Sequence, residues 1–171
     1  MNYTYEMRKK APLWYNNFSE KYYQSAQVLA ESKIPHNEVI NYLRGLSIEL
    51  LLKAILCTQT KDKPPKGHKL ESLADKVGLS LNKHERDLLQ LFTFIIEYAG
   101  RYPVSNNPEK DTAYHEKFLQ THFHTKDRLG KHSIYKPDED SKSRLNQNNF
   151  QKLYRKILDK FIESYESGWQ G

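Results

Sequence analysis

Hydrophobic positions recur every three or four residues in several long stretches of the chain, the spacing typical of α-helices. No stretch shows strand-like alternation of useful length. Proline and glycine separate the periodic stretches: Pro12 suits a first helical turn, Pro35 interrupts the pattern, and Gly78 stands where a left-handed C-terminal cap is expected. The pattern predicts an all-α fold, a bundle of four or five helices over 12–32, 36–58, 68–77, 82–100 and 146–167.

Two of these predicted helices are amphipathic, and we expect their apolar stripes to face the core. The stripe of the last helix comprises Phe150, Leu153, Tyr154, Ile157, Phe161 and Tyr165. The stripe of the first comprises Leu13, Tyr15, Phe18, Tyr22, Ala26 and Leu29. The fourth helix begins with a capping-box pattern, in which Asn82 caps the first amides and Glu85 bonds back to it.

The second predicted helix is apolar on nearly all sides over 45–57, which predicts a position in the centre of the bundle. Its only polar side chains in this stretch are Ser47, Glu49 and Lys53. Glu49 and Lys53 are spaced i, i+4 with the acid first, the favourable order for an ion pair. Two interpretations stay open. The pair is either structural, or part of a site in which Lys53 meets an anion or Glu49 orients a base.

The segment 101–144 is polar and irregular, with four of the seven histidines: His115, His122, His124 and His132. We expect a single helical domain over 1–171, with this segment as a histidine-containing insertion that holds at most a short helix over 113–123. The histidine separations match no zinc pattern and no cysteine accompanies them. We therefore expect no metal site.

Composition narrows the location and the partners. Lys and Arg outnumber Asp and Glu by 27 to 21, and the net charge of +6 favours an anionic partner such as RNA or a nucleotide. The single cysteine, Cys57, has no intramolecular partner, which is typical of the reducing cytoplasm. No signal peptide and no membrane helix are expected. A glycine-rich phosphate loop, a nucleophile elbow and an HExxH motif are also missing, so no cofactor is expected.

Three sequence blocks in order resemble a subgroup of the HEPN superfamily of helical domains: YLRGLSIELLLKAIL (42–56), KGHKLESLADKVGL (66–79) and EYAGRYP (97–103). The resemblance implies an up-and-down bundle of four or five helices, commonly a homodimer. Many HEPN proteins are ribonucleases of toxin–antitoxin, phage-defence or RNA-processing systems, and others are non-catalytic binding modules.

The nuclease members carry an arginine followed, after four to six residues, by a histidine. None of the arginines here meets that spacing, and the nearest approach is Arg128 with His132, which have only three residues between them. The first hypothesis is therefore a domain that binds RNA or a nucleotide in a defence or toxin–antitoxin setting. A ribonuclease with a non-standard site and a structural partner of another protein are the alternatives.

Five residues are the candidates for a site. RNA cleavage without a metal needs a group that moves a proton and a cation that stabilises the phosphorane, so His68 and Arg101 are the candidate catalytic residues. Glu49, Lys53 and Tyr102 are the candidate RNA- or ligand-binding residues. Each of the two candidate catalytic residues also has a structural interpretation. His68 could bond to the backbone at a helix start, and the charge of Arg101 could interact favourably with a helix C-terminus.

Overall fold

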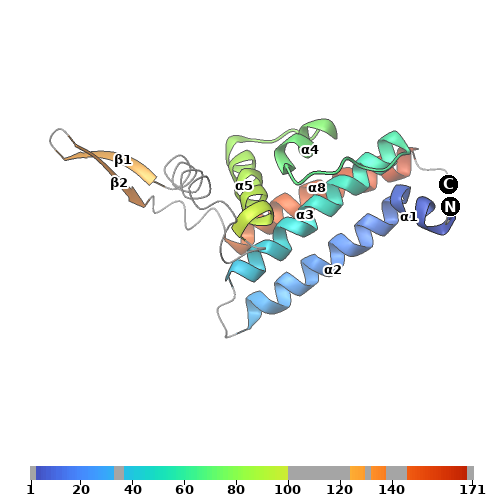
Figure 1. The fold of residues 1–171 in the computed structure, drawn as a ribbon, viewed down its shortest axis with the longest axis horizontal. Coiled ribbons are helices and arrows are strands. Elements are labelled where there is room, and N and C mark those ends of the chain that lie inside the picture. The colour runs from blue at the N-terminus through green and yellow to red at the C-terminus, as the bar shows by residue number, and fades with distance from the viewer. Residues whose placement is uncertain (1–2, 33–36, 100–123, 130–131, 138–145, 169–171) are drawn as a thin grey trace.

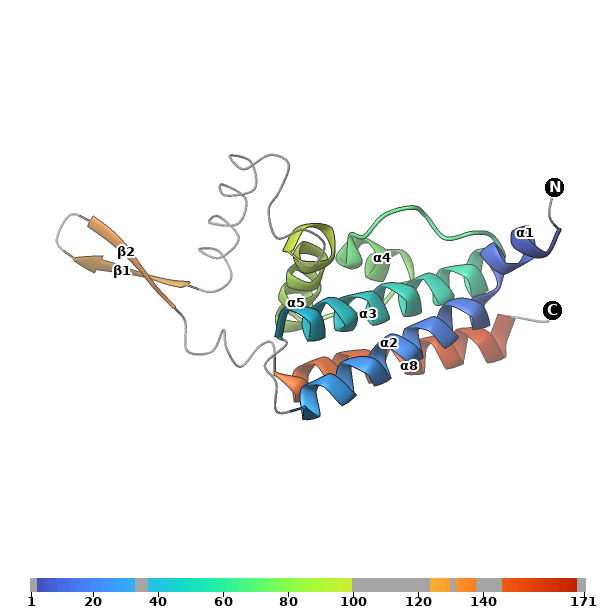
Figure 2. The same cartoon turned by 60° about the horizontal axis from the view of Figure 1, so that its bottom comes forward.

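Three long helices lie side by side in the computed structural model: α2 (Pro12–Glu31), α3 (Asn37–Thr60) and α8 (Gln147–Gly168) (Figure 1). The short α1 (Tyr3–Lys10) precedes α2, and α4 (Leu70–Lys76) and α5 (Lys83–Phe94) pack on another side of α3 (Figure 2). The π-helical turn η1 (Ile95–Ala99) continues α5. The structure describes residues 3–32, 37–99, 124–129, 132–137 and 146–168. The predicted all-α class is confirmed, and the predicted helix bounds agree closely with the observed ones.

Helix α3 is the centre of the core, as its sequence predicts. Its buried side chains meet those of α4, α5, η1 and α8 in one cluster, whose fully enclosed members include Ile48, Leu51, Leu52, Ile55, Leu70, Leu89, Phe92, Ile96, Phe150 and Ile157. Helix α3 approaches η1 closely at Gly45. A Cβ atom at this position would come within 2.9 Å of the Ile96 side chain. Any other residue at this position would therefore force the Ile96 side chain to shift.

The apolar stripe predicted for α2 is wrong in part. Leu13 and Phe18 are exposed, whereas the buried residues of this helix are Pro12, Ser19 and Ala26, spaced seven apart. Small side chains at that spacing let the α2 backbone approach α3 closely. Ser19 Oγ donates a hydrogen bond of 2.7 Å to the Ser47 carbonyl and lies 3.0 Å from the Tyr154 hydroxyl. The small, hydrogen-bonded face, rather than the most hydrophobic one, faces the core.

Two other local predictions are confirmed. Asn82 Oδ1 accepts from the Glu85 amide at 2.9 Å while Glu85 Oε2 accepts from the Asn82 amide at 2.8 Å, which is the predicted capping box. The stripe of α8 is buried at Phe150, Leu153, Tyr154, Ile157 and Phe161. Tyr23 of α2 stacks on Tyr154 with ring centroids 4.3 Å apart, so aromatic contacts join α2 to α8.

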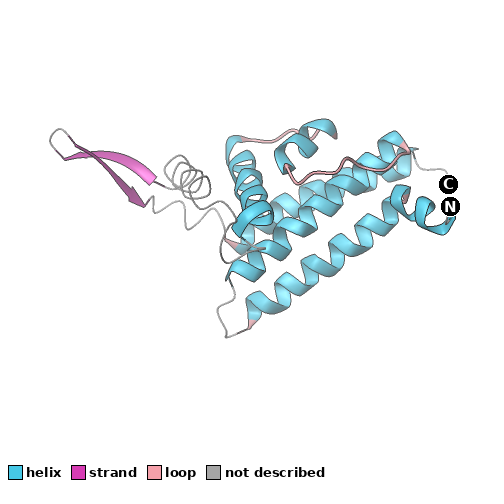
Figure 3. Cartoon of the chain, in the orientation of Figure 1, coloured by secondary structure: helices cyan, strands magenta, loops and turns pink. Residues whose placement is uncertain are grey.

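A β-hairpin, which the sequence pattern does not predict, lies to one side of the helical bundle (Figure 3). Strand β1 (His124–Leu129) pairs antiparallel with β2 (His132–Pro137), and Leu129 faces His132 across the turn. Both strands are mostly polar, so no apolar face identifies them in the sequence. The rest of 101–144, including the predicted helix over 113–123 with His115 and His122, lies outside the described residues.

Two absences concern only the described part of the chain. No group of three His, Cys, Asp or Glu side chains there could hold a metal ion. None of the helices described is both long and apolar enough to cross a membrane.

Because of Cys57, the free energy of unfolding depends on pH in the alkaline range. Its thiol is fully enclosed, and burial, aided by the charge of Asp62, raises the pKa of Cys57 to about 12. An unfolded chain loses this proton near pH 9, so the stabilisation is complete below about pH 9 and is lost as the pH rises toward 12, by at most about 1.4 kcal/mol per pH unit.

We therefore expect Cys57→Ala to flatten the fall in unfolding free energy between about pH 9 and pH 10, the range below the ordinary tyrosine pKa. Urea denaturation of both proteins across this range measures the two slopes. Equal slopes would show that the Cys57 thiol does not contribute to the pH dependence.

Candidate functional site

Three of the five candidate residues lie in direct contact. Lys53 Nζ donates to Glu49 Oε1 at 2.6 Å, and His68 Nδ1 lies 2.9 Å from the other carboxylate oxygen, Oε2. We call Glu49, Lys53 and His68 the Glu49 cluster. Glu49 and Lys53 lie one turn apart on α3, whereas His68 belongs to the segment that leads into α4. The predicted ion pair is present, with the imidazole as its third member.

The members of the cluster differ in exposure. The side chain of Glu49 is 5% exposed, that of Lys53 12% and that of His68 33%. A carboxylate withdrawn from water to this extent needs its oxygens satisfied, and here each oxygen has a partner. The imidazole forms the solvent-facing part of the cluster. With Nδ1 toward Glu49, the other ring nitrogen, Nε2, lies on the opposite side of the ring.

Helix α5 positions His68 by holding the start of α4. Lys69, at the N-cap position of α4, provides no side-chain cap, and the Leu70 amide instead donates to Thr93 Oγ1 of α5 at 3.0 Å. Glu71 accepts from Arg86 Nη1 at 3.2 Å and from Gln90 Nε2 at 2.7 Å. These bonds fasten the first turn of α4 to α5, directly after His68.

A lysine-rich loop leads to His68. Lys61, Lys63, Lys66 and Lys69 are all exposed, and Asp62 is the one acidic residue between them. Lys10 lies 3.4 Å from Asp62, which links this loop to α1. We call residues 61–69 the basic loop. Its surplus of positive charge beside a partly exposed imidazole favours the approach of an anion.

Arg101 and Tyr102, the other two candidates, lie outside the described residues. The structure therefore brings together Glu49, Lys53 and His68, and says nothing of the contacts of the remaining pair.

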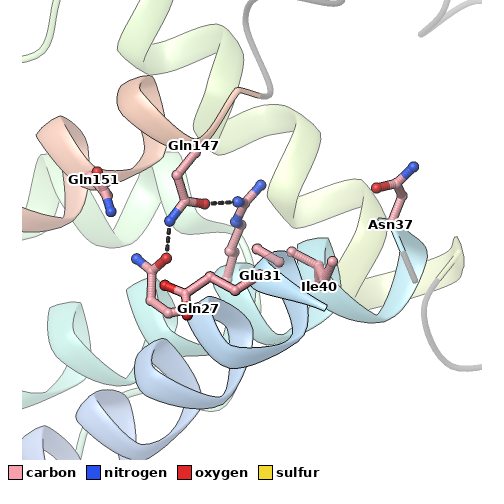
Figure 4. Close-up of a pocket in the computed structure, with 8 residues that line it drawn as sticks. Gln27, Glu31, Asn37, Ile40, Gln147 and Gln151 are labelled. Carbon is pink, nitrogen blue, oxygen red and sulfur yellow. Dashed lines mark hydrogen bonds between the residues drawn. The ribbon is translucent and has the colours of Figure 1, made fainter. Parts of the chain in front are cut away.

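A second polar site, which the sequence pattern does not predict, is a pocket of about 420 Å³ between α2, α3 and α8 (Figure 4). Arg44 lines it and is only 6% exposed. Its guanidinium donates to Asn41 Oδ1 at 3.2 Å and to Gln147 Oε1, and lies over the Phe150 ring, 5.1 Å from its centroid. Burial lowers the pKa of Arg44 from its usual value, an effect that Tyr23 opposes.

One signal in the sequence points toward this pocket: Arg44 begins the apolar stretch of α3, where a buried cation needs partners. Those partners are amides from elements far apart in the chain. Gln147 of α8 bridges Arg44 and Gln27, donating to Gln27 Oε1 (Figure 4). Uncharged glutamines give no charge pattern that would have linked the three residues.

Comparison with protein-family models gives a match to the HEPN domain over residues 13–120, well over half of the chain. Neither the curated proteins nor the solved structures contain a match to this sequence. The matched segment includes α2 to η1, and so the Glu49 cluster, the basic loop and Arg44. The chain belongs to the HEPN domain family.

Proposed function

We propose that this HEPN-domain protein binds RNA through the basic loop and the Glu49 cluster. The observation that carries the proposal is a partly exposed imidazole held by a buried glutamate, which also pairs with Lys53, close in the chain to four exposed lysines. Membership of the HEPN family points in general terms to an RNA-related or nuclease-like role. The net charge of +6 has the sign that an RNA partner requires.

Each part of this surface contributes differently to the proposed binding of RNA. The exposed lysines neutralise phosphates and release counterions, which supplies most of the affinity. Nε2 of His68 accepts a hydrogen bond from a base or a ribose hydroxyl, because Nδ1 donates to the Glu49 carboxylate. Arg101 and Tyr102 stay in the proposal as a further cation and as a ring on which a base stacks.

The wider setting rests on the family resemblance. We propose a homodimer, or a complex with a partner protein, that acts in the cytoplasm in a defence or toxin–antitoxin system. A nucleotide is the alternative ligand for the same surface.

A ribonuclease is the second candidate function, because the contact between Glu49 and His68 resembles an orienter and its base. A carboxylate on Nδ1 fixes the ring and leaves Nε2 to accept the proton of a ribose 2′-hydroxyl. Lys53 or Arg101 would then stabilise the phosphorane charge. The missing arginine–histidine spacing makes RNA binding the primary proposal.

Removing two charges from the basic loop should weaken RNA binding and its dependence on salt. The double variant Lys63→Gln/Lys66→Gln is expected to lower the slope of log affinity against log salt by about 1.4 for single-stranded RNA, as two lost phosphate contacts imply. Fluorescence anisotropy of a labelled single-stranded RNA over a series of salt concentrations measures both quantities.

The matched control is Lys152→Gln/Arg155→Gln, which removes the same charge from exposed positions of α8. Equal losses in both double variants would indicate a diffuse charge effect, and no binding at low salt by the folded protein would refute RNA binding.

The RNA recovered after the binding measurement tests for cleavage. Intact RNA supports a binding module, whereas cleavage that His68→Gln abolishes would make the ribonuclease the function.

A further inference from the structure

Two aromatic rings are in contact on the outer surface of α2. Trp14 and Phe18 lie one helical turn apart, with ring centroids 5.4 Å from each other and ring planes at 53°. Trp14 is 42% exposed and Phe18 is 37% exposed. Neither ring is among the side chains that form or border the core of the described residues. The packing of the core therefore does not account for this pair.

A cation lies over each of the two rings. The guanidinium carbon of Arg8, in α1, is 4.9 Å from the Trp14 ring centroid, and Lys21 Nζ is 5.1 Å from that of Phe18. Both cations are exposed. The acid Glu20 follows Phe18 by two residues, so it lies on another side of α2. We call Arg8, Trp14, Phe18 and Lys21 the aromatic cluster. It presents positive charge and aromatic surface together.

The cations hold the ring faces only weakly. A cation over an exposed ring contributes a factor of about 2–5 to an equilibrium constant. A nucleic-acid base stacked on an aromatic side chain contributes a factor of about 5–150, and every base has a face that can stack. An unpaired base would therefore displace the cation from the ring, and the displaced cation would be free to neutralise a phosphate of the same strand.

The aromatic cluster continues the surface proposed for RNA. Lys10, two residues after Arg8 in α1, lies 3.4 Å from Asp62 of the basic loop. Helix α1 lies at the end of the bundle where α3 ends and the basic loop begins (Figure 2). A strand whose phosphates contact the basic loop can therefore follow α1 to the two rings. An acidic protein segment would match the charges, but RNA supplies planar bases as well, so these observations favour RNA.

We propose that Trp14 and Phe18 stack unpaired bases of the RNA that binds at the basic loop. Arg8 and Lys21 then contact the phosphates beside those bases. This inference rests on the proposed binding of RNA and specifies the class of RNA as single-stranded, because bases in a duplex are stacked on each other and are closed to such rings.

Fluorescence anisotropy of the full chain with three labelled probes tests this proposal. The probes are an unstructured single-stranded RNA of about 12 nucleotides, its duplex, and an abasic strand of the same length. Trp14→Leu/Phe18→Leu should weaken binding of the single strand by about tenfold and leave binding of the duplex and the abasic strand unchanged. Trp14→Tyr/Phe18→Tyr, which keeps both rings, is the matched control and should retain the affinity.

Tryptophan fluorescence provides a second test that does not depend on the leucine variant. The chain has two tryptophans, so Trp14 is the only one left in Trp169→Phe. The single-stranded RNA should quench its emission by stacking, whereas the abasic strand should not.

The possible failures of the two proposals differ. If the natural chain binds the single strand but the leucine variant binds it equally well, the stacking proposal is overturned while RNA binding stands, and the rings would suit a protein partner. An equal loss with the abasic strand, or Trp14 emission that RNA does not quench, would overturn stacking in the same way. No binding of any probe by the folded natural chain would overturn both proposals.

Discussion

Lys53→Met is expected to lower the unfolding free energy by about 3 kcal/mol, since it removes one partner from a buried charged group. The Glu49 side chain is 5% exposed, and the substitution leaves its Oε1 without the lysine that lies 2.6 Å away. Methionine matches the lysine stem in shape, so packing contributes little to the loss. Urea denaturation followed by circular dichroism measures the change in midpoint.

The double variant Glu49→Leu/Lys53→Met should recover most of that stability, because an apolar pair of similar volume carries no desolvation cost. His68 loses its partner in this variant but is partly exposed and can bond to water. A double variant as unstable as Lys53→Met would contradict this expectation. RNA binding measured on the double variant separates structure from function, because a cluster with a structural role alone would leave the affinity unchanged.

Gly45→Val should destabilise the fold by a similar amount, about 3 kcal/mol, because it overpacks the contact between α3 and η1. A Cβ at position 45 would already lie 2.9 Å from two atoms of Ile96 and 3.4 Å from Phe92 Cβ, before the two methyl groups are added. Ile96 and Phe92 are fully enclosed in the core cluster, so a shift of either side chain disturbs its neighbours. Differential scanning calorimetry should show a fall in Tm of roughly 6–12 °C.

Gly168→Val is the matched control for this substitution. Gly168 also lies in a helix, α8, but nothing approaches the place of its Cβ within 4 Å. Its Tm should stay close to that of the natural chain. If Gly45→Val were equally well tolerated, the close approach of α3 to η1 would not be required for stability.

The helices from α2 onward were predictable because their signals are local, whereas the short and mostly polar α1 was not predicted. Proline at the start of α2 and the reciprocal bonds of Asn82 and Glu85 involve residues close together in the chain. The face of α2 was not predictable from hydrophobicity, since Ser19 is buried for its size and for its bond to Ser47, a contact between distant residues. The hairpin β1–β2 is mostly polar, and strand pairing leaves little trace in such a sequence.

The candidate site shows the same difference between local contacts, which the sequence predicts, and contacts between distant residues, which it does not. The spacing of Glu49 and Lys53 predicts their ion pair from one helical turn. The approach of His68 requires α4 to fold back over α3, and only the resemblance to HEPN proteins pointed to it. The Arg44 pocket depends on two glutamines 120 residues apart, whose pairing no local pattern reveals.

The bonds between α4 and α5 have a consequence for protein engineering. A helix of seven residues is too short to persist alone in water. Thr93, Arg86 and Gln90 hold its first turn and, with it, the place of His68. Grafting the histidine and its glutamate onto another helical scaffold would therefore fail unless α5 were transplanted with them, because the smallest transferable unit is three helices.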